Sequence, residues 1–507
     1  MKKIVLLCAL VLLFSITAAN VFGSGSGQQP AAGGKLPITI GYWMQKVGGD
    51  PWGDFILEKF NVDLTMKFQD WSNYTDMFRI WAAADDLPDA FAGYPMQQTW
   101  FPEFVDQQLI RTIPYSMISK YPQTKRKVDN DRIFQESLKM YRDYYYLPRP
   151  LSIEGLRASD NSGIYYRSDW AEKLGFNEKP TDMDTFYQMI RAFTYDDPDG
   201  NGIRDTYGIT GNLYTLYSFL NAYPNQWINS SNGRVIPGYL EESTMIPALQ
   251  WLRRAYMEGV LDPELTTERT AVALKFTSGV FGSYVIVFDY TGTDALKQQL
   301  KDSNPGINME HETIGAIAAM SPQRGGTRYH IPQPDGGGTA FSYNCSDAVM
   351  DKLLEIDDWL LSAEGQLFVN MGLKGTDWEQ NPDGSYRMTY TEPINTRYAS
   401  AYFGGFCAWL YDFNVTISPR VAERNKQLAI EWYREADTAS LNSPVNLIAG
   451  WASSPERSAF TFDYNSKLAE IITGTGSVET MYQAFVAEAN ANGVQRVIDS
   501  INRVISR

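Results

Sequence analysis

The sequence predicts an α/β fold made of two lobes. A chain of 507 residues is longer than one ordinary hydrophobic core needs, which favours two domains. Near its start, short apolar segments with strand spacing alternate with amphipathic segments of helical spacing. This alternation is typical of a mainly parallel sheet whose strands are joined by crossover helices.

The first unit shows this alternation most clearly. Strands are predicted over Leu36–Tyr42, Val62–Phe68 and Ala90–Ala92. Helices are predicted over Trp52–Phe60 and Tyr74–Ala84, since their apolar residues recur every three or four positions. Three strands with two intervening helices make one parallel layer.

A second unit begins near Pro148. Strands are expected at Ile164–Arg167 and at the apolar, β-branched run Val280–Phe288. Thr181 is the expected N-cap of its second helix. Helical spacing predicts helices over Asp169–Leu174, Asp182–Phe193, Ile246–Glu258, Met350–Leu361, Lys426–Ala436, Asn465–Ile472 and Val478–Asn490.

The composition excludes several classes of protein. A net charge of −15 argues against binding to nucleic acid or to an anionic membrane surface, because both are bound through Lys and Arg. The two His residues, His311 and His330, are too few for a histidine metal site. Outside the N-terminal apolar run, Cys345 and Cys407 allow one disulfide, and the sequence leaves open whether they pair.

The N-terminus resembles a secretory signal. Two lysines precede the apolar run Ile4–Ala18, which is shorter than the ~20 residues of a spanning helix. Residues 1–23 are therefore predicted to be the signal peptide, with 24–34 a flexible linker rich in Gly, Ser and Gln. An uncleaved membrane anchor is the alternative. The mature protein is expected to be exported, in the periplasm or at the cell surface.

One loop has the ligand pattern of a calcium site. Side-chain oxygens and one main-chain carbonyl fall at positions 1, 3, 5, 7 and 9 of the loop, from Asp197, Asp199, Asn201, Ile203 and Asp205. Gly202 stands at position 6, where a calcium loop turns sharply, but Gly208 replaces the bidentate Glu of an EF-hand at position 12. A structural Ca²⁺ site is the favoured interpretation, and a solvated Asp/Gly turn is the alternative.

Several short motifs, in this order and spacing, resemble the family of extracellular solute-binding proteins of ABC transporters. The branch is the one related to alginate- and oligosaccharide-binding lipoproteins. The motifs are Leu87-Pro88-Asp89, Tyr144–Pro148, Ile164–Trp170, the Asp197–Asp205 loop, Glu258–Glu264, Phe276–Gly282 and Asp358–Gly365. Each is weak alone, and together they extend over nearly the whole chain after the linker.

This resemblance implies a type II periplasmic-binding-protein fold with three hinge crossings. They are expected near Leu147–Pro150, Val285–Tyr290 and Gly336–Phe341. The N-terminal lobe would then comprise 35–147 and 290–336, and the C-terminal lobe 148–289 and 337–507. The implied function is capture of a sugar or oligosaccharide between the lobes and its delivery to the permease subunits of an ABC importer. The protein is expected to be a monomer.

Sugars are bound by aromatic stacking and by planar polar groups, and such residues are expected at strand ends that face the cleft. For each tryptophan, packing in the core is the alternative. Arg149 could instead form an ion pair at the hinge, and Asp289 could cap a turn. The candidate ligand residues are Trp43, Tyr94, Arg149, Trp227, Asp289, Tyr290, Trp409 and Trp451.

Other functions remain as alternatives to transport. A glycosidase or lyase needs a positioned carboxylate pair or a defined base, and no fixed motif of that kind stands out. A sensory or adhesin-type binding protein on the same fold is a further alternative. A peptide in place of the sugar also remains open.

Overall fold

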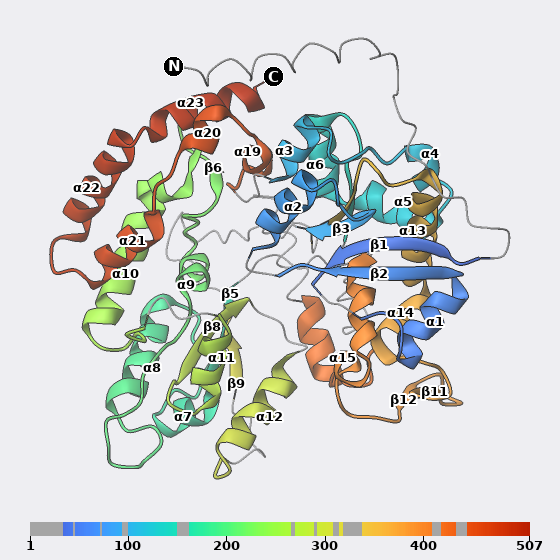
Figure 1. Ribbon diagram of the computed structural model, residues 1–507. Helices are drawn as coiled ribbons and strands as arrows, with labels where there is room; N and C mark the ends of the chain where they lie inside the picture. Colours follow the sequence, from blue (N-terminus) through green and yellow to red (C-terminus); the bar gives the residue numbers. More distant parts are fainter. Residues whose placement is uncertain are drawn as a thin grey trace, which may run out of the picture.

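The computed structural model describes residues 34–43, 46–70, 73–93, 100–149, 162–264, 269–287, 292–307, 314–317, 337–407, 417–431 and 444–506. Two large hydrophobic cores organise these residues into two lobes, which lie side by side in Figure 1. Within the described ranges, no helix is both long and apolar enough to cross a bilayer. The two-lobed α/β architecture agrees with the predicted fold class.

The first lobe is built on a five-stranded sheet in the order β2-β1-β3-β10-β4. β1 is parallel to β2 and β3, whereas β10 is antiparallel to both β3 and β4. The elements of this lobe are β1 (Leu36–Tyr42), α1 (Pro51–Lys59), β2 (Val62–Phe68), α2 (Tyr74–Ala83), β3 (Ala90–Gly93), α3 (Trp100–Asp106), α4 (Tyr115–Ile118), α5 (Pro122–Asn130), α6 (Arg132–Tyr141), β4 (Tyr146–Pro148), β10 (Gly338–Phe341), α13 (Asp347–Leu360), α14 (Ala363–Met371), β11 (Trp378–Gln380), β12 (Tyr386–Met388), α15 (Ile394–Arg397), the 3₁₀ helix η3 (Ala399–Phe403) and α16 (Gly404–Cys407).

The second lobe contains a three-stranded sheet in the order β8-β5-β9 and a β6–β7 hairpin. Its elements are β5 (Ser162–Arg167), α7 (Ser168–Lys173), α8 (Met183–Tyr195), α9 (Leu213–Phe219), β6 (Trp227–Asn229), β7 (Val235–Pro237), the 3₁₀ helix η1 (Gly238–Leu240), α10 (Glu242–Met257), α11 (Arg269–Thr277), β8 (Ser283–Val287), α12 (Thr293–Ser303), β9 (Ile314–Ile317), α19 (Leu447–Trp451), α20 (Pro455–Ala459), α21 (Tyr464–Thr473), α22 (Val478–Ala491) and α23 (Val494–Ile505).

The prediction of a mainly parallel sheet is wrong for the second lobe. β5 pairs antiparallel with both of its neighbours, β8 and β9. Parallel pairing occurs there only as isolated bridges among the described residues, such as Thr210 with Tyr284. The short strands carry too little pattern to reveal their direction, which depends on partners far along the chain.

The lobe boundaries also differ from the prediction. Strand β10 and helices α13 and α14 complete the first core, since Phe341, Leu353 and Phe368 are buried with it. Helix α12 and strand β9 belong to the second lobe, because Leu300 packs on Phe276 and β9 pairs with β5. Segment 290–336 is therefore not part of the first lobe where it is described, and 337–407 is not part of the second.

Accordingly, the chain passes between the two cores at three places: between Arg149 and Ser162, between Ile317 and Gly337, and beyond Cys407. The passage after Arg149 agrees with the crossing expected near Leu147–Pro150. The crossing expected near Gly336–Phe341 lies where the passage between Ile317 and Gly337 ends. The expected crossing at 285–290 is not supported, because the described elements on either side of it, β8, α12 and β9, all belong to the second lobe.

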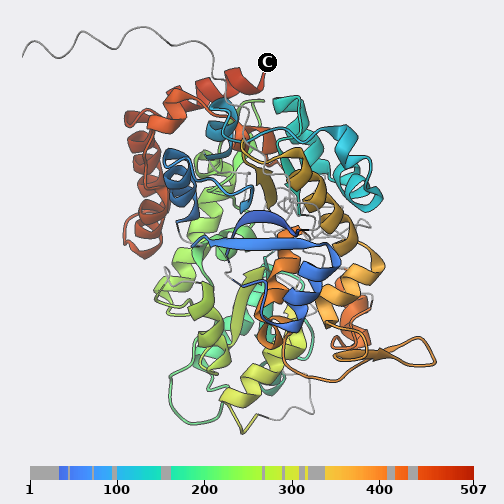
Figure 2. The same cartoon turned by 45° about the vertical axis from the view of Figure 1, so that its right-hand side comes forward.

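The lobes also touch away from these passages. Helix α19 of the second lobe packs against α6 of the first, and Figures 1 and 2 show the C-terminal helices beside α2 and α3 at the same end of the molecule. A polar groove of about 680 Å³ opens there between the lobes. Its walls are Arg79, Glu103, Asp106 and Gln107 on one side and Ser453, Ser454, Pro455 and Ser458 on the other.

Candidate functional site

The candidate site lies at one edge of the first-lobe sheet. β1, β3 and β4 all end there, because β4 and β3 each run antiparallel to the strand between them, β10. Trp43 follows β1 directly, and Arg149 follows β4. In open α/β sheets ligands bind outside the carboxyl ends of the strands, so both side chains stand at the expected edge.

Arg149 and Trp43 are in contact. The Cζ atom of Arg149 lies 5.4 Å from the centroid of the Trp43 ring, which is cation–π geometry. Arg149 is only 1% exposed, and its Nη1 atom donates to the carbonyl of Gly405 at 2.9 Å. The half-buried ring of Trp43 also meets Tyr42 and Tyr74 edge-on, at 5.3 and 5.7 Å. The indole is therefore held in one orientation by three neighbours.

Glycine is required where β10 begins beside this pair. Gly337 has φ +92°, in the left-handed region that disfavours other residues. A Cβ atom at Gly337 would lie 2.5 Å from the carbonyl oxygen of Gly93 and 2.7 Å from Nη2 of Arg149. The backbone N–H of Arg149 donates to the Gly337 carbonyl at 3.0 Å. Backbone from β3, β4 and β10 thus packs closely around the guanidinium.

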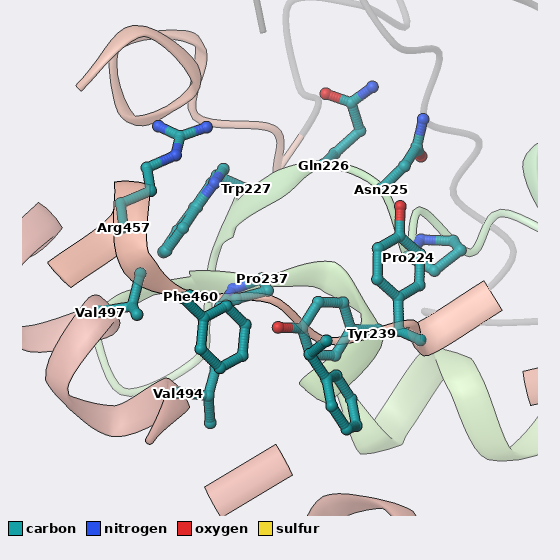
Figure 3. Close-up of a pocket in the computed structure, with 12 residues that line it drawn as sticks. Pro224, Asn225, Gln226, Trp227, Pro237, Tyr239, Arg457, Phe460, Val494 and Val497 are labelled. Atoms are coloured by element: carbon teal, nitrogen blue, oxygen red, sulfur yellow. The ribbon is translucent and has the colours of Figure 1, made fainter. Parts of the chain in front are cut away.

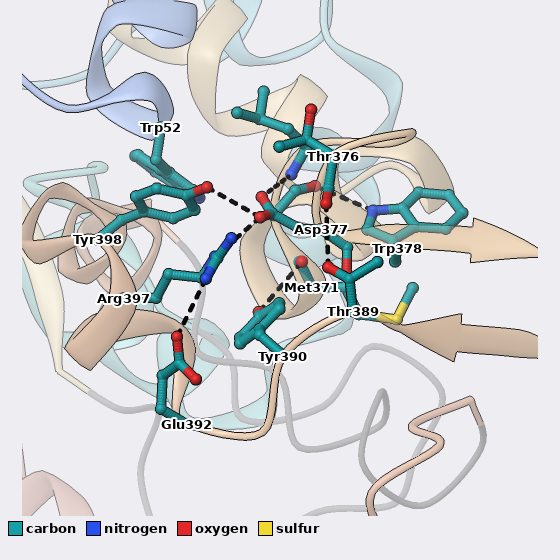
Figure 4. Close-up of polar contacts among 12 residues, drawn as sticks. Trp52, Met371, Thr376, Asp377, Trp378, Thr389, Tyr390, Glu392, Arg397 and Tyr398 are labelled. Carbon is teal, nitrogen blue, oxygen red and sulfur yellow. Dashed lines mark hydrogen bonds and ion pairs between the residues drawn. The ribbon is translucent and has the colours of Figure 1, made fainter.

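The segment that supplies Gly405 is anchored to the body of the lobe by a buried carboxylate (Figure 4). Asp377 is fully buried and accepts hydrogen bonds from Tyr398 Oη at 2.8 Å, Arg397 Nε at 2.9 Å and the Leu373 backbone N–H at 2.8 Å. The hydrogen bond with Asp377 raises the pKa of Arg397 above its ordinary value. Such charge-assisted bonds fix the start of η3, which leads to the Gly405 carbonyl.

The remaining predicted ligand residues do not gather at this edge within the described structure. Trp227 lies in the second lobe, half-buried, on β6. Trp451 ends α19, and its side chain is outside the described structure. Four further candidates lie outside the described residues: Tyr94, Asp289, Tyr290 and Trp409. The structure brings together Trp43 and Arg149.

Sequence reasoning missed the contribution of Gly337 and Gly405. Neither belongs to a motif with a chemical signature, and Gly405 acts through its carbonyl, which any residue type has. The pair Gly404-Gly405 before an aromatic segment was the only available signal of a close backbone approach.

In the Asp197–Asp205 loop, two of the predicted carboxylate ligands accept hydrogen bonds from one side-chain amide. Nδ2 of Asn201 donates to Oδ2 of Asp199 at 2.9 Å and to both carboxylate oxygens of Asp205 at 3.3 Å. Oδ1 and Oδ2 of Asp197 accept from the backbone N–H groups of Asn201 and Gly202. The partly positive amide group of Asn201 therefore lies between the carboxylates of Asp199 and Asp205.

The carboxylates of this loop are electrostatically crowded. Loss of solvation, followed by the proximity of Asp197 and Asp205, raises the pKa of Asp199. At Asp197 the same loss of solvation is outweighed by backbone N–H donors, which lower its pKa. Among the described residues no cluster of three His, Cys, Asp or Glu side chains is arranged for a metal ion. A cation here would need the Asn201 oxygen and the Ile203 carbonyl as well, and such hard oxygen donors are the ligands Ca²⁺ takes.

Cys345 is buried and free, and burial raises the pKa of its thiol well above the ordinary value. The side chain of Cys407 is outside the described structure.

Curated relatives match part of the chain. The lipoprotein LipO of Bacillus subtilis (strain 168) is 25% identical over 227 residues, 42% of this chain and 43% of that protein. The polygalacturonan/rhamnogalacturonan-binding protein YtcQ of the same organism is 23% identical over 48% of this chain and 46% of YtcQ. The fructooligosaccharide ABC transporter substrate-binding protein FusA of Streptococcus pneumoniae is 22% identical over 66% of this chain and 62% of FusA. The matches thus extend over less than two thirds of each relative.

Solved structures show the same fold over almost the whole chain. FusA of S. pneumoniae in complex with kestose superposes with a TM-score of 0.65 at 16% identity, over 92% of this chain and 98% of FusA. The alginate-binding protein AlgQ2 without calcium ion superposes with a TM-score of 0.63 at 16% identity, over 94% and 99% of the two chains. The family profile described as bacterial extracellular solute-binding protein matches residues 37–367, well over half of the sequence. The chain therefore belongs to the bacterial extracellular solute-binding protein family.

Proposed function

We propose that this protein is the substrate-binding component of an ABC importer and captures an oligosaccharide between its two lobes, outside the cytoplasmic membrane. The observation that carries the proposal is the Trp43–Arg149 pair at the carboxyl edge of the first-lobe sheet, in a chain of the solute-binding family. Aromatic faces stack on the C–H faces of sugar rings, and the ordered indole costs little entropy on binding.

The geometry favours a neutral sugar over an acidic one. The guanidinium of Arg149 is buried and engaged by the Gly405 carbonyl and the Trp43 ring. Its role is therefore to orient the indole, and pairing with a uronate carboxylate would require it to leave these contacts. The net charge of −15 also repels anionic polymers. Of the ligands named for the relatives, fructooligosaccharides fit this site better than polygalacturonan.

The fold supports capture by closure of a type II receptor, with the three passages between the lobes acting as hinges. A ligand that touches both lobes binds the closed state more tightly and shifts the population toward it. The closed form would then be recognised by the permease subunits of the importer, and a monomer suffices for this cycle. Catalysis forms no part of the proposal.

Isothermal titration with kestose, nystose and a galacturonan oligomer tests the proposal. We expect kestose or nystose to bind the wild type and Trp43→Ala to weaken that binding at least tenfold. Trp81→Ala is the matched control, because Trp81 is a half-buried tryptophan on α2 of the same lobe. Hydrolysis of the sugar, or equal binding by both variants, would refute the proposed site.

We further propose that the Asp197–Asp205 loop holds a structural Ca²⁺ ion through Asp197, Asp199, Asn201, Asp205 and the Ile203 carbonyl. The mutual repulsion of its carboxylates supports this, since a cation would relieve it. The melting temperature should fall on addition of EDTA and recover with excess Ca²⁺, because an ion that binds only the folded state stabilises that state. Asp199→Asn/Asp205→Asn should melt at the same temperature with and without EDTA. If EDTA does not change the melting temperature of the wild type, the loop is a solvated turn without a bound ion.

A further inference from the structure

The second lobe contains a pocket of its own, separate from the edge that carries Trp43 and Arg149. Its volume is about 260 Å³. All of its lining residues come from the second lobe, in the ranges 224–239 and 457–497 (Figure 3). A ligand in this pocket therefore needs no contribution from the first lobe and no closure.

Aromatic rings form the walls and are fixed by their neighbours. Trp227 lies under the guanidinium of Arg457, whose Cζ atom is 5.5 Å from the ring centroid. Arg457 is in turn held by the carbonyls of Ala449 and Ala452, at 2.9 and 2.5 Å from Nη1. Tyr239 stacks on Tyr464 at 4.8 Å between ring centroids. These contacts make the walls rigid before any ligand arrives.

Polar groups line one side of the ring cluster. Figure 3 shows the side-chain amides of Asn225 and Gln226 together above the aromatic residues, with the Arg457 guanidinium beside Trp227. Asn225 is exposed at the rim, whereas Gln226 is buried. The described residues that line the pocket include no Asp or Glu. An apolar floor with a few amides along one side is the composition that binds a ring with one C–H face and several hydroxyls.

From this geometry we infer that the Trp227 pocket is a second carbohydrate site, which takes a single neutral sugar ring. Pockets for drug-sized ligands have about 300–1,000 Å³, so this smaller cavity is suited to one ring rather than a chain. A neutral ring is specified because the charge of Arg457 is already satisfied by two carbonyls and an indole face. The choice of a sugar rests on the proposed function.

A site of this size binds weakly. A ligand of a dozen non-hydrogen atoms at ordinary ligand efficiency gives a dissociation constant of about a millimolar. Because all the lining residues belong to one lobe, occupancy by a free ring should not depend on closure of the two lobes. The ring could arrive as a free monosaccharide or as the end of an oligosaccharide seated in the cleft, and both present the same C–H face.

Saturation-transfer NMR on the whole chain with methyl glycosides tests the inference. Asn225→Trp places a bulky group at the exposed rim without removing a buried contact, and Ala484→Trp adds the same group at an exposed position on α22 of the same lobe. We expect saturation transfer to a methyl glycoside in the wild type, in Ala484→Trp and in Trp43→Ala, and at least a tenfold loss in Asn225→Trp. Phe460→Ala, which removes a wall, should show the same loss, and thermal melts verify that each variant is folded.

Titration with oligosaccharides separates the two sites. If the ring is the end of a longer ligand, Asn225→Trp should also weaken a long oligosaccharide while leaving a trisaccharide unchanged. Saturation transfer that persists in both Asn225→Trp and Phe460→Ala, or that disappears in Trp43→Ala, overturns the second site. Failure of the wild type to bind a trisaccharide would instead count against the proposed cleft site, whether or not the Trp227 pocket binds a sugar.

Discussion

At the residue scale, the two candidates that the structure brings together share one property: each directly follows a strand that ends at the same sheet edge. Trp43 follows β1 and Arg149 follows β4. The sequence showed this position for Trp43, whereas Arg149 was selected because it stands at the first expected crossing. Trp227 was also a candidate, yet it lies on a strand of the other lobe. Residue type alone therefore did not locate the site.

The planar shape of Arg149 is expected to matter as much as its charge. Arg149→Lys keeps the charge but loses both the flat group over Trp43 and the geometry of the bond to the Gly405 carbonyl. We predict a lower melting temperature and an oligosaccharide affinity reduced at least tenfold, measured by thermal melt and titration. Arg111→Lys, a partly buried arginine that binds the Cys345 carbonyl in the same lobe, is the control and should leave affinity unchanged. Wild-type affinity in Arg149→Lys would contradict this role.

At the scale of elements, strands and helices with strong local signals were predicted well. β1 and β2 match their predicted bounds residue for residue, because apolar alternation and the adjacent polar turns define both ends. Helix α8 is capped by Asp182 rather than by the predicted Thr181, since Oδ1 of Asp182 accepts from the Thr185 N–H at 2.8 Å. Neighbouring Thr and Asp are both good caps, and only the backbone conformation decides between them. Helix α23 was missed, although Val494, Val497, Ile498 and Ile501 form a buried stripe.

The Asp182 cap makes a testable contribution to the pH dependence of stability. Hydrogen bonds from the backbone N–H and hydroxyl of Thr185 lower the pKa of Asp182 below its usual 3.8. As the pH falls, the Asp182 carboxylate therefore binds a proton in the unfolded state before it does in the folded state. The stabilisation by this cap is present above pH 3.8 and is lost as the pH falls through the lower pKa of the folded state. Asp182→Asn keeps an acceptor but does not titrate. We expect the stability advantage of the wild type over Asp182→Asn, from urea unfolding, to be smaller at pH 3 than at pH 7.

Asp184→Asn, in the same helical turn, is the control for that experiment. A difference between wild type and Asp182→Asn that is the same at both pH values would contradict the assignment of the cap.

Helices α5 and α13 are joined by a fully buried ion pair. Nζ of Lys127 donates to both carboxylate oxygens of Asp357, at 2.7 and 2.8 Å, and the side chains of both residues have no solvent exposure. Removing one partner leaves an uncompensated buried charge, so Lys127→Met should destabilise the protein by about 3–5 kcal/mol. Replacing both, in Lys127→Met/Asp357→Leu, should recover most of this loss. Denaturant unfolding measures both, and an equal loss in the single and double variants would contradict the explanation.

At the scale of the whole molecule, the sequence predicted two lobes but not which segments complete them. The run Val280–Phe288 looked like an exit from the second lobe, yet α12 and β9 return to it. Helix α13 was recognised as amphipathic, but its apolar face fits either core equally well on composition, and α14 was not predicted as a helix. The core that a helix joins is determined by contacts with residues more than a hundred positions away in the sequence. Hydrophobic periodicity carries no information about such contacts.

Ligand-driven closure is the prediction that belongs to this scale. Small-angle scattering of the purified protein should show a smaller radius of gyration with saturating oligosaccharide, because the closed state is favoured by contacts with both lobes. A methyl glycoside that occupies only the Trp227 pocket should leave the radius unchanged, since its lining belongs to one lobe. Compaction by the methyl glycoside alone would contradict the separation of the two sites.

The position of β10 in the sheet has a consequence for how the protein is made. Gly338 pairs with Pro148, about 190 residues earlier in the chain, and β10 is the strand that joins β4 to β3. A growing polypeptide therefore has no complete first lobe until β10 has been synthesised, and closing so long a loop is slow. We therefore expect the first lobe to complete its fold late in synthesis, which would be compatible with passage through a secretion channel that threads extended polypeptide.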